Sequence, residues 1–177
     1  LAEKISGETD GDFDITVAPM VNAWGFGFKT GNPPTRQTID SLRAIVGFHN
    51  VALQDGYVIK KNPKTMLDCS AIAKGYGTDV VARFLKKKGI QNFMVEIGGE
   101  IVVNGNSEKL QPWRIGINKP TDDSLNTSQA IQDVVSVSNI AMATSGNYRN
   151  FYYKNGKKYA HTIDPKTGTI IDRKSGS

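Results

Sequence analysis

The sequence lacks the set of cysteines that a disulfide-linked or zinc-finger protein needs, and it lacks the long apolar run of a membrane-spanning helix. Cys69 is the only cysteine among the 177 residues, so no disulfide can form within the chain and a zinc-finger framework is excluded. No stretch approaches the roughly 20 consecutive apolar residues that a membrane-spanning helix needs. No signal peptide stands at Leu1 and both ends are abrupt, so we expect the chain to be a piece of a longer protein.

A strong excess of charge of one sign is also missing. The chain has 22 Lys and Arg against 17 Asp and Glu, which leaves a formal net charge of +5. This surplus suits a phosphate-bearing ligand, but runs such as Lys86–Lys88 are more typical of solvated surfaces. Nucleic-acid binding would need a basic stripe with interleaved aromatic residues or a known motif, and neither is present.

Several catalytic and nucleotide-binding motifs are absent as well. The stretches GFGFKTG (25–31) and GYGTDV (75–80) lack the third glycine of the dinucleotide-binding motif, and the chain has no P-loop. No Gly-x-Ser-x-Gly turn is present, which argues against a Ser-His-Asp hydrolase. A nucleophilic cysteine would need an electropositive pocket and a base, so we interpret Cys69 as a small residue at the start of a helix.

What the sequence does contain is two helical patterns. One follows Thr38, which we expect to cap it, and closes at Gly47. The other covers residues 70–88 and ends before Gly89, a residue type suited to the position after a helix. In this longer helix we expect a buried stripe formed by Ile72, Val80, Val81, Phe84 and Leu85.

Strand patterns are more numerous than helical ones. The dipeptides Asp55-Gly56 and Asn155-Gly156 each predict a β-hairpin, because both residues tolerate the positive φ of a two-residue turn. Because strands dominate around two main helices, we expect an α+β fold rather than a doubly wound sheet. Further strands are expected at 13–17 before Pro19, 92–97, 100–105, 113–118 and 130–139.

Polar residues surround the start of the longer predicted helix. In LDCSAIAKGYG (67–77), Asp68 stands before the first turn and Lys74 follows one turn later. The free amides of a helix N-terminus attract anions, and a nearby cation strengthens the attraction. The alternative is that Asp68 or Ser70 only caps the helix while Lys74 is solvated. Both interpretations stay open from the local sequence.

A glycine between two aromatic residues also allows two interpretations. Trp24 and Phe26 flank Gly25 in VNAWGFG (21–27). They are either core aromatics at a turn or the walls of a pocket for an aromatic ring, which a glycine lets the backbone approach.

The chain has only two histidines. His161 lies in AHTIDPKTG (160–168), where a strand pattern runs into an Asp-Pro turn, so we expect its imidazole at the rim of a loop. It is either a catalytic base or an ordinary polar residue at a strand end, and most lone histidines are structural. His49 matches no motif, and we interpret it as structural.

Six motifs together resemble one family. They occur in order from about Gly11 to Ile171, and any one of them alone would carry little information. The motifs are DGDFDITVAPMVNAWGFG, LDCSAIAKGYG, VEIGGEIVVNG, WRIGINKP, TSGNYR and HTIDPKTG. In this order they resemble the FAD:protein FMN transferases, the ApbE family. Members of that family are longer, and this chain resembles their middle portion.

The resemblance implies a fold and a set of site residues. The family has a T-fold-like α+β architecture rich in antiparallel strands, which implies a single FAD-binding domain over residues 1–177. The catalytic position of the family falls on His161. A metal-binding position falls on Ala71, whose backbone carbonyl would have to be the ligand, and the remaining metal ligands would lie beyond Ser177. The implied FAD contacts are Trp24, Gly25, Phe26, Asp68, Lys74 and Ile171.

The resemblance also implies a reaction. Family members use FAD and Mg²⁺, transfer FMN to a Thr or Ser of a target flavoprotein, and release AMP. The implied acceptors include subunits of ion-pumping NADH:quinone oxidoreductases, and the implied location is the periplasmic side of the inner membrane, reached through an upstream lipid anchor. Two alternatives stay open, namely an FAD pyrophosphatase that releases FMN and AMP, and a flavin-binding domain without catalysis.

Overall fold

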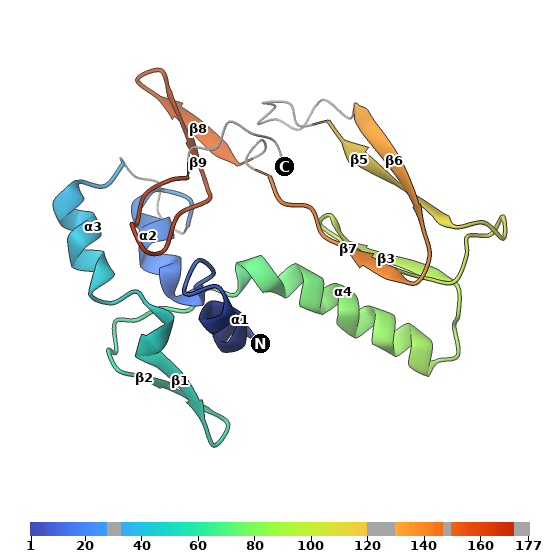
Figure 1. Cartoon of the computed structure of the whole chain (residues 1–177), viewed down its shortest axis with the longest axis horizontal. Coiled ribbons are helices and arrows are strands. Elements are labelled where there is room, and N and C mark those ends of the chain that lie inside the picture. The colour runs from blue at the N-terminus through green and yellow to red at the C-terminus, as the bar shows by residue number, and fades with distance from the viewer. Residues whose placement is uncertain (28–32, 120–129, 147–149, 172–177) are drawn as a thin grey trace. The chain divides into compact units, whose positions relative to one another are not determined.

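The computed structural model describes residues 1–27, 33–119, 130–146 and 150–171, which divide into two units (Figure 1). The first unit contains residues 1–69 and 150–171, and the second contains residues 70–146. Each unit has its own cluster of buried hydrophobic residues. The second unit is therefore inserted into the sequence of the first. A single FAD-binding domain over residues 1–177 stays a prediction.

The first unit combines short helices with two β-hairpins. Its helices are α1 (Ala2–Glu8), α2 (Ala18–Ala23) and α3 (Arg36–Arg43), with single 3₁₀ turns at η1 (Ile15–Val17) and η2 (Phe48–Asn50). Its hairpins pair β1 (Val51–Gln54) with β2 (Tyr57–Lys60) and β8 (Phe151–Lys154) with β9 (Lys157–Ala160). Both hairpin predictions are confirmed, and the turn residues have the expected positive φ, 51° and 80° at Asp55 and Gly56 and 51° and 74° at Asn155 and Gly156.

The predicted strand at 13–17 is wrong, because a helical turn is capped there. Asp14 Oδ1 accepts hydrogen bonds from the backbone N–H of Thr16 at 2.8 Å and from its hydroxyl at 2.7 Å. An Asp in this position favours a helical turn over a strand. Pro19 ends no strand but lies in the first turn of α2, where the fixed φ of proline suits a helix.

α3 begins earlier than the sequence suggests. Thr35 rather than Thr38 is its N-cap, and the Thr35 hydroxyl accepts a hydrogen bond from the N–H of Thr38 at 3.2 Å. The helix ends at Arg43, before the predicted stop at Gly47. Thr35 follows two prolines in the sequence, and its extended backbone completes the cap.

The core of the first unit joins residues from both of its sequence segments. Its buried members are Met20, Trp24, Val46 and Ile163, and Met20 is only 1% exposed. The partly buried residues packed around them are Val17, Val21, Phe26, Ile39, Leu42, Tyr159 and Ile170. This core fixes the segment that follows β9 against α2 and α3.

The second unit consists of one long helix and antiparallel strands. α4 (Ser70–Lys87) precedes a three-stranded sheet in the order β3-β4-β7 and a separate pair of β5 with β6. The predicted position of α4 is confirmed, and Gly89 has a φ of 82°, as expected after a helix end. The sequence does not predict β7, which is too short to show alternation. The strands are β3 (Phe93–Ile97), β4 (Glu100–Asn104), β5 (Trp113–Asn118), β6 (Ile131–Val137) and β7 (Ile140–Met142).

The predicted buried stripe of α4 is wrong. Val80, Val81 and Phe84 have exposed fractions of 42%, 40% and 57%. The buried residues of the helix are instead the small Thr78 and Ala82, and the Thr78 hydroxyl lies 3.3 Å from the carbonyl of Glu100 in β4. Close approach of the β3–β4 hairpin therefore selects small residues on the buried face of α4.

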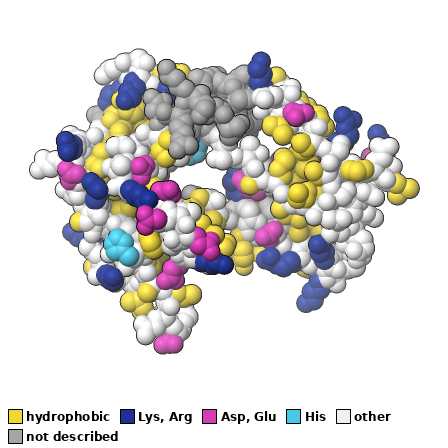
Figure 2. All heavy atoms as spheres, in the orientation of Figure 1, with side chains coloured by type: hydrophobic (Ala, Val, Ile, Leu, Met, Phe, Trp, Pro, Cys, Tyr) yellow, Lys and Arg dark blue, Asp and Glu magenta, His cyan; other side chains and the backbone are white. Residues whose placement is uncertain are grey.

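The α+β class is confirmed, and every strand pair in the described ranges is antiparallel. Within those ranges, no helix has both the length and the hydropathy needed to cross a membrane. On the face that Figure 2 shows, Lys and Arg side chains are scattered among acidic and neutral ones.

Candidate functional site

His161 follows the last residue of β9, at the strand end that the sequence predicts. Its backbone N–H donates to the carbonyl of Asn150 at 3.2 Å, and its ring Nδ1 lies 3.2 Å from the same oxygen. Because a carbonyl oxygen only accepts, Nδ1 carries the proton in this contact. In the neutral ring Nε2 then holds the lone pair, so the Asn150 carbonyl selects the tautomer in which Nε2 can accept a proton.

A stack of aromatic rings lies beside this imidazole. Phe26 packs edge-on against His161 with ring centroids 6.4 Å apart, and it also packs on Tyr152 at 5.3 Å. Tyr152 in turn stacks on Tyr159 at 5.2 Å. Burial, followed by the nearby Tyr159, raises the pKa of Tyr152 above its ordinary 10.0. The protonated hydroxyl donates to the carbonyl of Trp24 at 3.0 Å, which ties the stack to the end of α2.

Trp24 belongs to the core of the first unit. It is 9% exposed, and its ring centroid lies 5.8 Å from that of Tyr159. Its indole Nε1 donates to the carbonyl of Gly168 at 2.8 Å. The structure thus gives Trp24 a structural role, and contact with FAD stays a prediction.

Gly25 ends α2 in a left-handed conformation, with a φ of 84°. Its N–H donates to the carbonyl of Asn22 and the N–H of Phe26 donates to the carbonyl of Val21, both at 3.1 Å. This pair of hydrogen bonds is the Schellman arrangement that satisfies the last carbonyls of a helix. A glycine is required here because the positive φ strains other residues.

The loop after His161 closes on itself. Ile163 and Ile170 form an isolated antiparallel bridge, and the N–H of Ile171 donates to the carbonyl of Thr162 at 3.0 Å. Ile171 therefore folds back beside Thr162, the residue that follows His161, and its contact with FAD stays a prediction.

Asp164 organises the inside of this loop. Its Oδ1 accepts hydrogen bonds from the N–H groups of Lys166 at 2.8 Å and Thr167 at 3.3 Å. Burial alone would raise the pKa of this carboxyl. The hydrogen bonds from the Thr167 hydroxyl and the two amides, with the Lys166 charge, outweigh burial and hold the pKa of Asp164 below its ordinary 3.8.

Lys166 connects the same loop to the start of the chain. Its Nζ lies 2.9 Å from Asp12 Oδ1 and 3.4 Å from Asp10 Oδ2. The hydrogen bond to Asp12 is the main reason that the pKa of Lys166 is raised above its ordinary 10.5. All three side chains are largely exposed, so these ion pairs orient the loop more than they stabilise the fold.

The predicted residues around α4 divide between the two units. Asp68 lies in the first unit, where its N–H donates to the carbonyl of Ile15 at 2.7 Å. Lys74 lies in the second unit, where its Nζ donates to the carbonyl of Gly98 at 2.8 Å and lies 3.0 Å from Glu100 Oε1. The cation predicted for an anionic ligand is thus paired with a carboxylate that is only 17% exposed.

Ala71, the implied metal-binding residue, lies in the first turn of α4 and is exposed. A backbone carbonyl there offers one oxygen, whereas Mg²⁺ prefers near-octahedral oxygen coordination. In the part of the chain that the structure describes, no group of three or more His, Cys, Asp or Glu side chains could hold a metal. Ala71 and the other described residues therefore do not make up a magnesium site by themselves.

Two of the predicted site residues are in direct ring contact, namely Phe26 and His161. Asn150, which sets the tautomer of His161, is missed by the sequence analysis, although the hairpin register could have found it. Phe151 faces Ala160 across the hairpin, so Asn150 must face His161. The first unit holds Trp24, Gly25, Phe26, Asp68, His161 and Ile171, and the second holds Ala71 and Lys74.

The motif TSGNYR (144–149) is described only in part. Thr144 and Ser145 are exposed outside any strand. Tyr148 and Arg149 lie outside the described residues.

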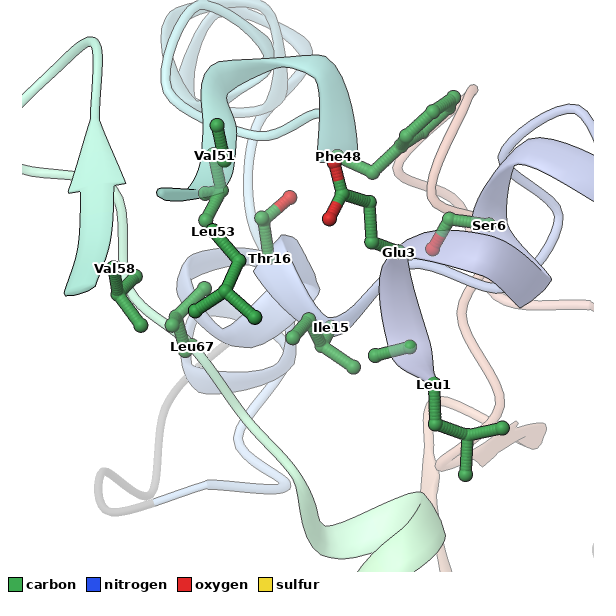
Figure 3. Close-up of a pocket in the computed structure, with 12 residues that line it drawn as sticks. Leu1, Glu3, Ser6, Ile15, Thr16, Phe48, Val51, Leu53, Val58 and Leu67 are labelled. Atoms are coloured by element: carbon green, nitrogen blue, oxygen red, sulfur yellow. The ribbon is translucent and has the colours of Figure 1, made fainter. Parts of the chain in front are cut away.

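An apolar pocket of about 190 Å³ in the first unit contains none of the predicted site residues. Figure 3 shows Ile15, Leu53, Val58 and Leu67 among the side chains around it. The hydroxyl of the fully buried Ser6, which also lines it, has no hydrogen-bond partner among the described residues. With so few polar groups, the pocket is unsuited to a nucleotide.

Comparison with known proteins matches the whole chain, residues 1–177, to the ApbE family. The FAD:protein FMN transferase of Vibrio cholerae is 41% identical over 175 residues, covering 98% of this chain and 51% of the relative. That of Haemophilus influenzae is 40% identical over 176 residues, covering 96% and 50%. The chain therefore spans about half the length of the curated relatives it matches.

Solved structures agree with the sequence relatives. The flavin transferase ApbE from Vibrio cholerae has a TM-score of 0.82 at 41% identity, covering 97% of this chain and 53% of that one. The ApbE protein from Thermotoga maritima has a TM-score of 0.81 at 30% identity, covering 96% and 54%. The family match over every residue, the identity to curated relatives and the shared fold lead to one conclusion: this chain belongs to the ApbE family.

Proposed function

We propose that the complete protein transfers FMN from FAD to a Thr or Ser of an acceptor flavoprotein and releases AMP. The observation that carries the proposal is the geometry of His161, whose Nδ1 is held by the Asn150 carbonyl. This contact leaves Nε2 to act as the base. Family membership and the names of the relatives support the same reaction.

His161 would take the proton from the acceptor hydroxyl as its oxygen bonds to the phosphorus of the FMN moiety. The bond from that phosphorus to the bridging oxygen breaks, and AMP leaves with the bridging oxygen. Phosphoryl-type transfers depend mainly on positioning, on neutralising the phosphate oxygens and on orienting the nucleophile. In this chain, the Asn150 carbonyl and the ring of Phe26 would position the imidazole.

We further propose that FAD contacts Trp24, Gly25, Phe26, Asp68, Lys74 and Ile171. The proximity of Phe26 to His161 supports this for the flavin end. Magnesium, when bound, would neutralise phosphate charge. Because the described residues do not form its site, we assign no step of the reaction to the metal.

The test is FMN transfer by the complete protein with His161→Ala. With FAD, Mg²⁺ and an acceptor protein, we expect the rate of covalent flavin formation, seen as fluorescence on a denaturing gel, to fall about 10²–10⁴-fold. His49→Ala is the matched control because it removes the other histidine, and its rate should stay unchanged. Transfer by His161→Ala at the wild-type rate would refute the base assignment. Joint loss of transfer and of folding would make His161 structural.

The same assay separates the two alternatives. Without acceptor, a pyrophosphatase would still release FMN and AMP from FAD, whereas a transferase would release little. A non-catalytic binding domain would bind FAD and release neither product. Product analysis by chromatography distinguishes the three outcomes.

The acceptor and the compartment rest on the resemblance alone. We propose that the acceptors are subunits of ion-pumping NADH:quinone oxidoreductases and that the protein works on the periplasmic side of the inner membrane. Deletion of the gene should remove covalent flavin from these subunits in membrane fractions. Persistence of flavin-labelled subunits would count against this acceptor class.

A further inference from the structure

A second cleft of the first unit, of about 400 Å³, brings a cationic helix face next to the loop that follows His161. Its α3 residues are spaced i, i+3, i+4 and i+7, so they share one face of the helix. Its two threonines come from the loop, and their hydroxyl oxygens lie 2.8 Å apart. The lining residues are Trp24, Arg36, Ile39, Asp40, Arg43, Thr167 and Thr169.

The loop cannot separate from α3 without losing contacts. Gly168, which stands between these threonines in the sequence, is buried. A Cβ at this position would lie only 2.6 Å from Cγ2 of Ile39. The indole of Trp24 also donates a hydrogen bond to the carbonyl of Gly168 at 2.8 Å. In Figure 1, α3 and the segment after β9 both flank α2. The shape of the cleft is therefore fixed by the same contacts that fix the loop of the proposed base.

The cleft has an uncompensated positive charge. Arg43 Nη1 lies 3.9 Å from Asp40 Oδ1, so these two charges offset one another. No carboxylate of the described residues forms an ion pair with Arg36, which is exposed. A guanidinium matches the two oxygens of a carboxylate with paired hydrogen bonds.

We propose that this cleft binds an acidic side chain of the acceptor protein and so helps to select the Thr or Ser that receives FMN. One net positive charge suits one carboxylate, whereas the pyrophosphate of FAD carries two negative charges. Ile39 supplies an apolar wall for the aliphatic part of a Glu or Asp. Complementary charge of this kind contributes mainly to choice of partner. The inference rests on the proposed function, which must hold for an acceptor to exist.

The test measures FMN transfer by the complete protein to a purified NADH:quinone oxidoreductase subunit as acceptor concentration is varied. We expect Arg36→Gln to raise the KM for the acceptor about five- to tenfold. This change corresponds to a binding free energy between that of an exposed ion pair and that of a charge-assisted hydrogen bond. The kcat and the KM for FAD should stay unchanged. Arg36→Lys should recover part of the loss because it keeps the charge without the paired hydrogen bonds. Replacing acidic residues near the acceptor hydroxyl with Asn or Gln should raise KM similarly.

Gln37→Glu is the matched control, because it changes the charge of the same exposed helix by one unit outside the cleft. Its KM for the acceptor should stay near that of the wild type. An unchanged KM in Arg36→Gln, or an equal rise in Gln37→Glu, would overturn the cleft assignment. A rise in the KM for FAD instead would assign the anion to the nucleotide and also overturn it. Absence of transfer by the wild-type protein would overturn the proposed function and the cleft together.

Discussion

Replacing Gly168 with alanine should destabilise the first unit far more than an ordinary glycine substitution. Gly168 is buried and has a φ of 70°, which strains any residue with a side chain. Its alanine Cβ would lie 2.6 Å from Cγ2 of Ile39 and 3.2 Å from the sulfur of Met20. Because Met20 is 1% exposed, the neighbouring core has little room to move.

The expected magnitude has two parts. A left-handed conformation costs a non-glycine residue about 1–2 kcal/mol, and overpacking a core typically costs about 1–3 kcal/mol. Alanine also restricts the unfolded chain, which returns about 0.4–1 kcal/mol. The free energy of unfolding should therefore fall by about 1–4.5 kcal/mol, a large share of the roughly 5–15 kcal/mol typical of a domain.

Gly156→Ala is the matched control. Its φ of 74° is nearly the same, but no atom lies within 4 Å of the added Cβ, so only the backbone strain applies. Urea denaturation of both variants in a Trp113→Phe background, where Trp24 is the remaining tryptophan, would compare them by fluorescence. If Gly168→Ala is no more destabilising than Gly156→Ala, the close approach of the loop to α3 is wrong. Adding Ile39→Ala, which removes the clashing methyl, should reduce the extra cost.

Three further predictions concern the contacts around the site. Trp24→Phe loses the 2.8 Å hydrogen bond to the Gly168 carbonyl and should lower the free energy of unfolding in urea by about 0.5–1.5 kcal/mol; no change would mean that water replaces the indole. The pKa of Asp164 is lowered in the folded chain, so its charge stabilises the fold above the unfolded pKa near 3.8, and this stabilisation is lost as the pH falls through the folded pKa. The difference in unfolding free energy between wild type and Asp164→Ala should therefore narrow below about pH 4, and a constant difference would contradict this. Lys74→Met should destabilise the second unit in urea by about 0.5–1.5 kcal/mol through loss of the Gly98 and Glu100 contacts, and it should have no further effect in a Glu100→Gln background if the ion pair is the main contribution.

Local sequence rules succeed where the local chain decides the structure. The pairs Asp55-Gly56 and Asn155-Gly156 predict both hairpins, because few other residue pairs tolerate the positive φ of a two-residue turn. The end of α4 is predicted because Gly89 suits the left-handed position. The position of His161 at a strand end follows from the second hairpin. These features depend on neighbours within a few residues.

The same rules fail where distant contacts decide. The alternation at 13–17 predicts a strand, but the Asp14 carboxylate caps a turn and also accepts a hydrogen bond from the N–H of Phe48 at 2.7 Å. The large apolar residues of α4 suggest a buried stripe, but the hairpin that packs on the helix fits only small residues such as Ala82. For the candidate site, sequence motifs predict His161 and Phe26, and the structure places their ring centroids 6.4 Å apart. The Lys166 contacts with the start of the chain depend on the tertiary fold and have no local signal.

The insertion of one unit into the other has a consequence for biosynthesis. The core around Met20 and Trp24 needs Ile163, and the hydrogen bond from Trp24 to Gly168 spans 144 residues. A ribosome adding about 5–20 residues per second would therefore leave the N-terminal half of this core unpaired for roughly 7–29 s. The second unit is contiguous and built from hairpins, so we expect it to fold first and to shorten the stretch that must close. In refolding experiments, the fluorescence of Trp24 in Trp113→Phe would report on the first unit, and the fluorescence of Trp113 in Trp24→Phe would report on the second. We expect the Trp24 signal to change later than the Trp113 signal.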